Sequence, residues 1–274
     1  MIDINKNYNE SNLETLKRIP DNTIDLTVTS PPYDNLRIYK GFTMDWKELL
    51  KELYRTTKEG GVVVCVVGDA TQKGSETGTS FKQALFAMKC GFNLHDTMIY
   101  AKDAISFPDK NRYQNSFEYM FVLSKGKPKT INLIHDRKNI SFGRKVTGTN
   151  RTASGETKKA SCYGNDIKEY GARWNIWNIR TDKGNNKTGH PAMFPEQLAQ
   201  DHILSWSNEN DLVYDPFMGS GTTAKMSILN NRNWIGSEMS SEYCEIIEER
   251  VKKAWEEKRK EKDLQAQTLF GTQK

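Results

Sequence analysis

Residues 212–223 read Leu212-Val213-Tyr214-Asp215-Pro216-Phe217-Met218-Gly219-Ser220-Gly221-Thr222-Thr223. The apolar run 212–214 predicts a strand, residues 222–230 predict a helix, and two glycines lie in the turn between them. Glycines at such a turn let backbone N–H groups approach a ligand closely, and the amino end of a helix favours a negative group such as a carboxylate. The segment therefore predicts a strand–turn–helix unit with a ligand site at its turn.

The same alternation of strand and helix runs along most of the chain. Residues 24–29, 62–67, 97–101, 119–123, 212–214 and 234–236 are predicted strands, and 46–58, 80–90, 195–206, 222–230 and 241–263 are predicted helices. Gly60 and Gly61 are expected to stop the first of these helices, and Gly91 to cap the second. The order predicts an α/β fold with a doubly wound, mostly parallel sheet, whose ligands lie beyond the carboxyl ends of the strands.

The overall composition fits a cytoplasmic protein without a membrane partner. The mean hydropathy is −0.74, and no apolar run approaches the roughly 20 residues that cross a bilayer. The first residues lack the pattern of a signal peptide. None of the four cysteines forms a CxxC pair and the four histidines lack metal-ligand spacing, so we expect no metal site.

Positive charge is concentrated in one part of the chain. Residues 124–189 hold 15 Lys and Arg against 5 Asp and Glu, whereas the rest holds 25 against 30. Periodicity is weak over the same stretch, which is typical of a long loop or an insertion. Either it binds a polyanion or it is a solvated loop, and charge alone does not separate the two.

An acidic residue strengthens the ligand interpretation of the glycine turn. Glu238 follows the next predicted strand, 17 residues after Gly221. A carboxylate in that place can accept hydrogen bonds from both hydroxyls of a ribose, which favours a nucleoside cofactor. A P-loop is disfavoured because no lysine follows the second glycine, and the remaining alternative is a purely structural turn.

A second candidate site, Thr29-Ser30-Pro31-Pro32-Tyr33, ends the first predicted strand. Two prolines fix a rigid, extended backbone whose carbonyls need no internal partner and can accept hydrogen bonds from an amino group. Ser30 offers a further acceptor, and Tyr33 offers a ring that can stack on a flat base. The alternative is a Pro-Pro strand terminator followed by a core tyrosine.

These segments together resemble the β group of amino-group DNA methyltransferases. Ser30-Pro31-Pro32-Tyr33 resembles their (D/N/S)PP(Y/F) catalytic motif, and Asp215-Pro216-Phe217 with Gly219-Ser220-Gly221-Thr222 resembles their cofactor loop. Gly189-His190-Pro191-Ala192-Met193-Phe194-Pro195 is similar to the segment that covers the methionine end of the cofactor, and residues 236–243 to the segment whose acid holds the ribose. The resemblance covers residues 4–251 and weakens across 124–189.

The resemblance implies a Rossmann-like methyltransferase fold with a circularly permuted connection and an antiparallel strand near residues 119–123. Its cofactor would be S-adenosyl-L-methionine. The implied domains are a catalytic-motif half at 1–123, a target recognition region at 124–189, a cofactor-binding half at 190–263 and a tail at 264–274. Tyr163, Tyr170, Trp174 and Trp177 would suit base or groove contact in the target recognition region.

The same resemblance implies the residues of the site. The catalytic residues would be Ser30, Pro31, Pro32 and Tyr33. The cofactor-binding residues would be Asp215, Phe217, Gly219, Ser220, Gly221, Thr222, Glu238, His190, Pro191 and Phe194.

The expected activity is site-specific methylation of double-stranded DNA at the exocyclic N4 of a flipped-out cytosine. Serine at the position of Ser30 is commoner in N4-cytosine enzymes of this family, and aspartate in adenine N6 enzymes, which are the alternative. Carbon-5 methylation typically uses a Pro-Cys pair, which this chain lacks. More distant alternatives are methylation of RNA or protein, and an inactive DNA-binding module. The sequence leaves open a homodimer and a cognate restriction endonuclease.

Overall fold

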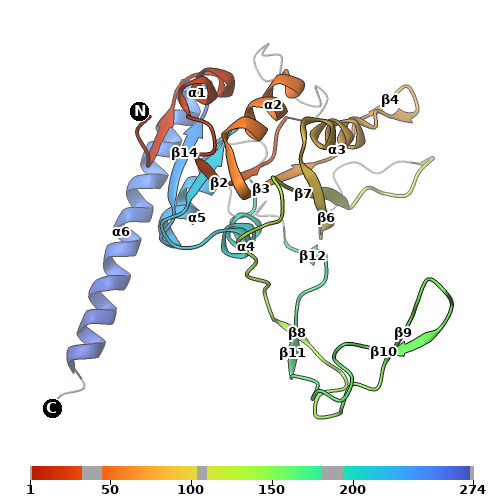
Figure 1. Ribbon diagram of the computed structural model, residues 1–274. Coiled ribbons are helices and arrows are strands. Elements are labelled where there is room, and N and C mark those ends of the chain that lie inside the picture. Colours follow the sequence, from red (N-terminus) through yellow and green to blue (C-terminus); the bar gives the residue numbers. More distant parts are fainter. Residues whose placement is uncertain (1, 33–44, 104–109, 181–193, 272–274) are drawn as a thin grey trace. The chain divides into compact units, whose positions relative to one another are not determined.

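A mixed sheet organises the larger of the two units into which the chain divides (Figure 1). The computed structural model describes residues 2–32, 45–103, 110–180 and 194–271. Unit 1 comprises Met1–Asn132 and Asn175–Lys274, and unit 2 comprises Leu133–Trp174.

The main sheet of unit 1 has eight strands within the described residues. In spatial order they are β1 (Lys6–Tyr8), β14 (Asn233–Ser237), β13 (Leu212–Asp215), β2 (Ile24–Thr29), β3 (Thr57–Val67), β7 (Phe117–Ser124), β6 (Asn93–Ala101) and β12 (Ile176–Asn178). All neighbours are parallel except β7, which runs antiparallel to both β3 and β6. The expected antiparallel strand is thereby confirmed. A short hairpin of β4 (Thr71–Gln72) and β5 (Ser75–Glu76) stands apart from this sheet.

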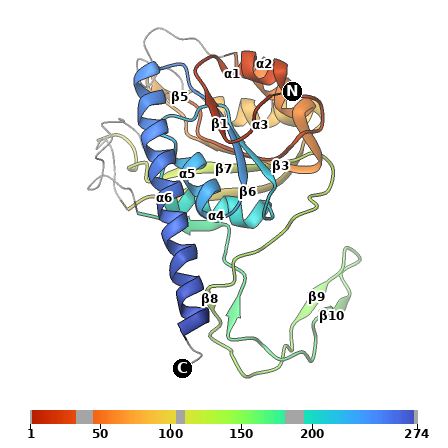
Figure 2. The same cartoon turned by 90° about the vertical axis from the view of Figure 1, so that its left-hand side faces the viewer.

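Helices cover both faces of this sheet (Figure 2). One face carries α1 (Asn12–Arg18), α2 (Trp46–Thr56) and α3 (Thr79–Cys90), and the other carries α4 (Glu196–Trp206), α5 (Thr222–Leu229) and α6 (Ser241–Gly271). The alternation of side chains along β3 shows why both faces are apolar. Val62 and Val64 lie in one core cluster, with residues of α4, and Val63 lies in the opposite cluster, with residues of α1 and α2. This arrangement confirms the predicted doubly wound α/β fold.

The Gly60-Gly61 pair does not end a helix, contrary to the prediction from the sequence. Helix α2 ends at Thr56, where the Thr56 hydroxyl donates to the Glu52 carbonyl at 2.8 Å. Gly60 and Gly61 lie inside β3, at an irregularity in its pairing with β2. Gly60 has a φ of 82°, and a Cβ on Gly61 would lie 3.0 Å from the backbone oxygen of Asp25. Glycine is needed here to bend a strand.

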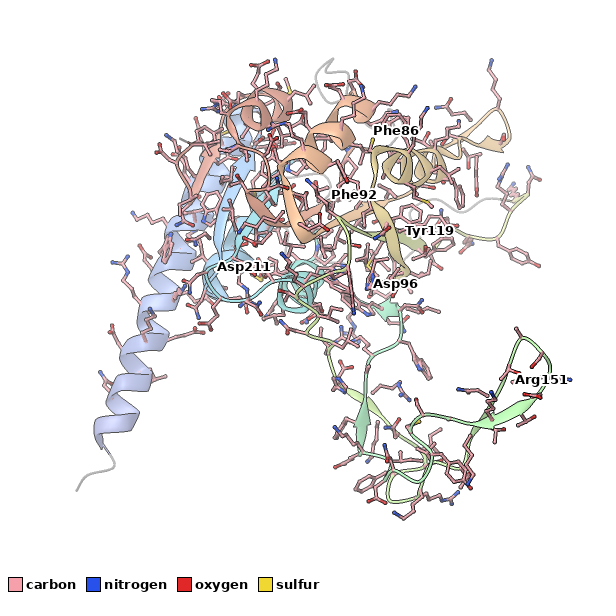
Figure 3. All side chains as sticks on the ribbon, in the orientation of Figure 1. Phe86, Phe92, Asp96, Tyr119, Arg151 and Asp211 are labelled. Atoms are coloured by element: carbon pink, nitrogen blue, oxygen red, sulfur yellow. The ribbon has the colours of Figure 1, made fainter. Side chains whose placement is uncertain are left out.

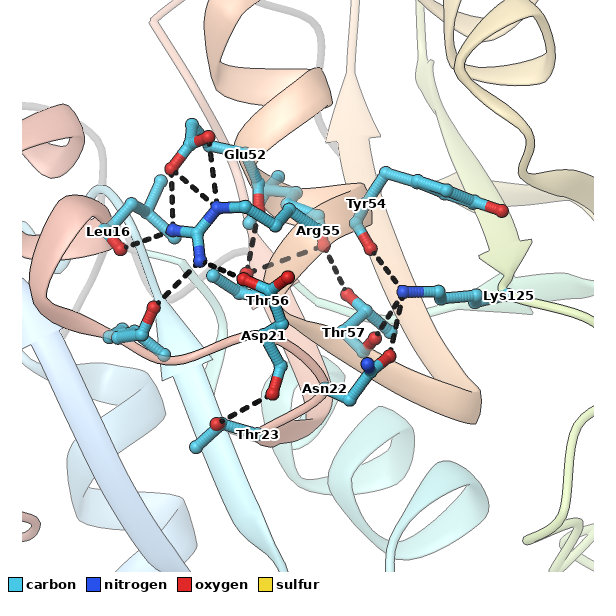
Figure 4. Close-up of polar contacts among 12 residues, drawn as sticks. Leu16, Asp21, Asn22, Thr23, Glu52, Tyr54, Arg55, Thr56, Thr57 and Lys125 are labelled. Carbon is cyan, nitrogen blue, oxygen red and sulfur yellow. Dashed lines mark hydrogen bonds and ion pairs between the residues drawn. The ribbon is translucent and has the colours of Figure 1, made fainter.

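Ionic and polar contacts join the segments near the amino ends of β2 and β3 (Figure 4). The Arg55 guanidinium donates to the backbone oxygens of Leu16 and Ile19 and forms an ion pair with Asp21 at 2.6 Å. The Lys125 ammonium donates to the Asn22 side chain and to the Tyr54 carbonyl, each at 2.9 Å. These contacts satisfy carbonyls at the ends of α1 and α2.

Unit 2 is built from short antiparallel pairs. β8 (Arg137–Lys138) pairs with β11 (Tyr170–Gly171), and β9 (Thr149–Arg151) pairs with β10 (Thr157–Lys159), the hairpin that carries Arg151 in Figure 3. No residue of Leu133–Trp174, all of which the structure describes, is buried. The unit therefore has no hydrophobic core of its own, and its shape rests on backbone hydrogen bonds and on polar contacts such as the ion pair of Arg173 with Asp136.

One predicted DNA-contacting aromatic residue lies in the core of unit 1. Trp177 belongs to β12, is 5% exposed and stacks on His202 with ring centroids 4.6 Å apart. The assignment of Trp177 to a nucleic-acid surface was therefore wrong, because the parallel pairing of β12 with β6 turns this ring inward. Across the described residues, no helix has both the length and the apolar character needed to cross a bilayer.

Candidate active site

The two candidate motifs meet where β2 and β13 lie side by side. The strands are parallel and pair at Thr27 and Tyr214, so their carboxyl ends reach the same edge of the sheet. From β13 the chain continues through α5 to β14 on one side, and from β2 through α2 to β3 on the other. Ligands of open α/β sheets bind at such a switch point in the strand order. Ser30 and Asp215 both lie there.

Asp215 joins the two motifs through its side chain. Its Oδ1 accepts hydrogen bonds from the Thr29 hydroxyl at 2.9 Å and from the Phe217 backbone N–H at 3.0 Å. Its Oδ2 accepts a bond from the Thr223 hydroxyl at 2.7 Å. Burial raises the pKa of Asp215 to about 6, although these three donors oppose the rise. These contacts hold the glycine turn after β13 against the end of β2.

The glycine turn takes a backbone shape that other residues adopt only with strain. Gly219 has a φ of 55° and Gly221 a φ of 83°. A Cβ added to Gly221 would lie 3.2 Å from Cγ1 of Ile247 in α6. The Met218 N–H donates to the Ser237 carbonyl at 2.9 Å, which closes the turn onto the end of β14. The amino end of α5 follows at once and can receive an anionic group.

Glu238 lies against this turn, one residue after β14. Its Oε2 accepts a hydrogen bond from the Gly219 N–H and its Oε1 from the Ser240 N–H, each at 2.9 Å. Burial raises the pKa of Glu238, whereas these backbone bonds oppose the rise. Each oxygen retains acceptor capacity beyond these bonds, so the carboxylate can also accept from a pair of ligand hydroxyls.

A narrow apolar pocket lies between the two motifs and α2. It encloses about 450 Å³, counting its open mouth. Thr29 and Pro31 line it from the first motif, and Phe217 lines it from the second. The other lining residues are Trp46, Leu49, Leu50, Leu53, Cys65, Gln83, Ala84, Phe121 and Leu123. Its apolar lining lowers the local dielectric beside the ends of the two motifs.

The structure places the predicted residues unevenly. Ser30, Pro31 and Pro32 follow β2, with Pro31 buried. Asp215, Phe217, Gly219, Ser220, Gly221, Thr222 and Glu238 gather around the glycine turn. Phe194 packs against the core cluster that contains Leu198 and Ile203 of α4. Tyr33, His190 and Pro191 lie outside the described residues.

Four further residues support the site although the sequence analysis assigned them no role. Thr29 and Thr223 stand inside the quoted motifs, and only the fold shows that both bond to Asp215. Arg250 donates to the Ser220 carbonyl at 2.7 Å and forms an ion pair with Glu196 at 2.7 Å. Arg250 and Glu196 are 54 residues apart, so no local pattern could have linked them.

Comparison with known proteins identifies the family. A family model described as DNA methylase, for N6 and N4 methyltransferases, matches residues 24–249. This chain belongs to the DNA methylase family. The match spans both motifs of this methylase and the region between them.

Relatives of known description align along most of the methylase. It is 61% identical over 245 residues to the orphan methyltransferase M.BamHII of Bacillus amyloliquefaciens, covering 86% of this chain and 91% of the relative. It is 26% identical over 253 residues to the DNA adenine methyltransferase YhdJ of Escherichia coli (strain K12), covering 85% and 78%.

Solved structures share the fold of the methylase. The PvuII DNA methyltransferase (cytosine-N4-specific) matches with a TM-score of 0.65 at 22% identity, covering 89% of this chain and 85% of that one. A putative DNA modification methylase from Thermus thermophilus, complexed with S-adenosyl-L-methionine, matches with a TM-score of 0.60 at 21% identity, covering 91% and 95%. The expected Rossmann-like methyltransferase fold is confirmed.

The cofactor of the methylase is S-adenosyl-L-methionine, which is the methyl donor of its family. The residues present fit a nucleoside with a charged tail. Glu238 offers a half-buried carboxylate beside the glycine turn, and the left-handed Gly219 and Gly221 let the backbone approach a ligand. Within the described ranges, no three His, Cys, Asp or Glu side chains are grouped to hold a metal ion.

Proposed function

We propose that this methylase transfers a methyl group to the exocyclic N4 of cytosine in double-stranded DNA. The observation that carries the proposal is the bond between the Thr29 hydroxyl and Asp215 Oδ1, 2.9 Å long. It ties the end of β2, where Ser30 stands, to the loop that would hold the methyl donor. Two motifs 186 residues apart in the chain thereby face one crevice.

Ser30 and Pro31 would prepare the amine for reaction. The lone pair of an exocyclic amine is delocalised into the ring, so the amine is a poor nucleophile. The Ser30 hydroxyl and the Pro31 carbonyl would accept hydrogen bonds from the two N–H groups of the amine. These bonds would favour a tetrahedral nitrogen whose lone pair points at the methyl group. S-adenosyl-L-methionine would supply that methyl group from a sulfonium centre, which leaves as a thioether, and the proton that the methylated amine loses would pass to solvent.

The surroundings would strengthen these hydrogen bonds and hold the base. The apolar pocket beneath Pro31 and Phe217 keeps the local dielectric low. A base inside a duplex cannot reach the site, so it must be flipped out, and Tyr33 would stack on its ring. No covalent enzyme intermediate is needed in this scheme. Orientation and hydrogen bonding would supply most of the rate enhancement.

The cofactor would occupy the opposite side of the crevice. Glu238 would accept hydrogen bonds from the ribose hydroxyls, and Phe217, Gly219, Ser220, Gly221 and Thr222 would form the wall of the site. His190, Pro191 and Phe194 are proposed to cover the methionine end. Asp215 would shape the loop from below, since both of its oxygens already accept bonds from the protein.

Adenine N6 is the second candidate target. Cytosine N4 is proposed because residue 30 is serine, which in this family is commoner in N4-cytosine enzymes. The alternative has support of its own, because the 26% identical relative YhdJ is described as a DNA adenine methyltransferase. Both targets are exocyclic amines and use the same geometry at Ser30 and Pro31.

Unit 2 is proposed to be the centre of the target recognition region, 124–189. Leu133–Trp174 holds nine Lys and Arg against four Asp and Glu. Its aromatic rings are exposed, as at Trp174, and two lie beneath cations: Lys159 lies 4.4 Å from the Tyr163 ring and Arg137 5.2 Å from the Trp174 ring. Exposed cations and rings suit phosphates and base edges.

The proposed setting is the cytoplasm, without a cognate restriction endonuclease. All four cysteines are free thiols, as expected in a reducing compartment. The relative that shares 61% identity is described as an orphan methyltransferase. A homodimer stays a prediction from the family.

Long-read sequencing of DNA from cells that express the chain tests both the target base and its context. We expect N4-methylcytosine in one sequence context, and none in cells that express the Gly219→Asp variant. Methyladenine in place of methylcytosine would move the assignment to the second candidate. Unmodified DNA alongside folded, cofactor-binding protein would contradict the proposal.

A further inference from the structure

The carbonyl in the middle of the glycine turn is held from outside by an arginine of α6. Arg250 Nη1 donates to the Ser220 carbonyl at 2.7 Å, to the Ser220 hydroxyl at 2.8 Å and to the Thr222 hydroxyl at 3.2 Å. The side chain of Arg250 is only 13% exposed. Helix α6 runs beside α5 in both views (Figures 1 and 2), which brings Arg250 to the start of α5.

These contacts fix one peptide plane of the turn at both of its ends. Ser220 C=O and Gly221 N–H belong to the same peptide unit. The carbonyl accepts from Arg250, and the N–H donates to the Met218 carbonyl at 2.8 Å. Two glycines flank Ser220, and glycine restricts the backbone least of all residues. The turn therefore depends on such external contacts for a single conformation.

Arg250 is itself held by a charged partner at the start of another helix. Its Nη2 donates to Glu196 Oε1 at 2.7 Å, and Lys225 of α5 donates to Glu196 Oε2 at 2.8 Å. Burial alone would raise the pKa of Glu196, but the bond to Lys225 and the charges of Lys225 and Arg250 hold it below its usual value. Glu196 is the first residue of α4. The network thus joins α4, α5, α6 and the turn.

We infer that Arg250 is a positioning residue for the methyl donor. It holds the Gly219–Gly221 turn in the conformation that binds S-adenosyl-L-methionine, and Glu196 holds Arg250. Arg250 acts through the Ser220 backbone, so its loss weakens cofactor binding and leaves the chemical step unchanged. The inference rests on the proposed assignment of this turn as the cofactor loop.

The test compares Arg250→Gln with Lys253→Gln. Lys253 lies one turn further along α6 and forms an exposed ion pair with Glu249, so its substitution removes a comparable charge without touching the turn. Calorimetry gives the Kd for S-adenosyl-L-methionine and its demethylated product. Methyl-transfer kinetics give kcat, and the KM for each substrate. Thermal melting and circular dichroism report the fold.

Arg250→Gln is expected to raise the Kd for S-adenosyl-L-methionine about tenfold or more, since hydrogen bonds from a charged group are worth roughly that factor or above. The kcat at saturating cofactor and the KM for DNA should stay within about twofold. Arg250→Lys should restore part of the affinity, because lysine keeps the charge but lacks the planar fork. Lys253→Gln should match the wild type.

An unchanged Kd in folded Arg250→Gln would overturn the inference, as would an equal loss of affinity in Lys253→Gln. If Arg250→Gln does not fold, the Kd of Arg250→Lys for S-adenosyl-L-methionine replaces it. A Kd above the wild-type value would support the inference, and an unchanged Kd would overturn it. Gly219→Asp separates this inference from the assignment beneath it. If Gly219→Asp binds S-adenosyl-L-methionine normally, the cofactor loop itself is misplaced. If it loses binding and Arg250→Gln does not, only the role of Arg250 fails.

Discussion

Asp215 is a buried acid whose side chain contacts both motifs. Three donors surround its carboxylate, and none of them is a cation: Thr29, Phe217 and Thr223 supply hydroxyl and backbone groups. Burial therefore dominates, raising the pKa to about 6, and the charge of nearby Glu238 adds to the rise. A charged Asp215 costs the fold some stability in exchange for the loop geometry.

That cost predicts a pH dependence. The pKa of Asp215 is about 6 in the folded protein against 3.8 for the free side chain. The folded state therefore loses stability as pH rises from about 4 to about 6, and the loss persists above pH 6. Asp215→Asn removes this ionisation. We expect the free energy of unfolding of the variant, relative to wild type, to be higher at pH 7.5 than at pH 4.5 by about 2 kcal/mol. Urea unfolding at the two pH values measures it, and a difference independent of pH would contradict it.

Ser30 and Tyr33 are expected to fail in different ways when replaced by alanine. Ser30 would act on the amine during reaction, so Ser30→Ala should lower the single-turnover rate about a hundredfold at saturating cofactor, with DNA binding near normal. Tyr33 would hold the flipped base, and stacking contributes roughly 1–3 kcal/mol per base. Tyr33→Ala should weaken base capture, with a smaller defect for Tyr33→Phe.

Ser75→Ala, in the exposed β4–β5 hairpin, is the matched control for the serine substitution. It should react at the wild-type rate. A wild-type rate for Ser30→Ala as well would remove the catalytic role of the motif and leave only a proline strand terminator.

Most elements of unit 1 were predictable because the spacing of apolar residues in the sequence matches the faces that these elements bury. The continuous apolar run of β3 and the spaced apolar residues of α2 report the faces that they bury. Shorter elements lack such a signal. β1 and α1 are brief and largely polar, and β12 lies in a stretch that otherwise lacks periodicity. Helix α6 runs to Gly271, past the predicted end at residue 263.

The residues of the candidate site also differ in how far they could be predicted from the sequence. Residues in short local motifs, such as Ser30, Asp215 and Glu238, could be proposed from spacing and resemblance. Their partners could not, because Thr29 and Arg250 acquire their contacts only when distant segments meet. The misplacement of Gly60 has a related cause. A glycine pair after a helix is typical of a helix end, and only strand pairing shows that it bends β3.

The β9–β10 hairpin is the element on which DNA binding can be tested most simply. Lys158 and Lys159 lie on β10 and are exposed. If both contact phosphates, Lys158→Glu with Lys159→Glu should weaken DNA binding and reduce the log–log salt slope by roughly 2, since each contact contributes about 0.9. The affinity for S-adenosyl-L-methionine should not change.

A charge-matched control uses two exposed lysines of α6, in Lys252→Glu with Lys260→Glu. This pair should leave the salt slope near the wild-type value. An unaltered slope in the hairpin variant, or an equal change in both variants, would mean that the hairpin lysines do not touch the DNA backbone.

At the scale of the whole molecule, we propose that the two units have separate roles in one reaction. Unit 1 has the sheet, the buried core and the crevice at the switch point of its strand order. Unit 2 has an excess of cations and no buried residue. A charged segment without a core gains order most readily by binding a partner of opposite charge. We therefore propose that unit 1 carries out the chemistry and that unit 2 recognises DNA.

The most direct test of the central claim is the chemical identity of the methylated base. Purified methylase is incubated with duplex DNA and S-adenosyl-L-methionine that carries a deuterated methyl group. The DNA is then digested to nucleosides, which are separated by chromatography. Mass spectrometry identifies them against standards of N4-methyldeoxycytidine, 5-methyldeoxycytidine and N6-methyldeoxyadenosine. We predict deuterated N4-methyldeoxycytidine, absent when Ser30→Ala replaces the wild type at short reaction times. Label in 5-methyldeoxycytidine, or no labelled nucleoside, would contradict the account, and label in N6-methyldeoxyadenosine would keep the site but overturn its assigned base.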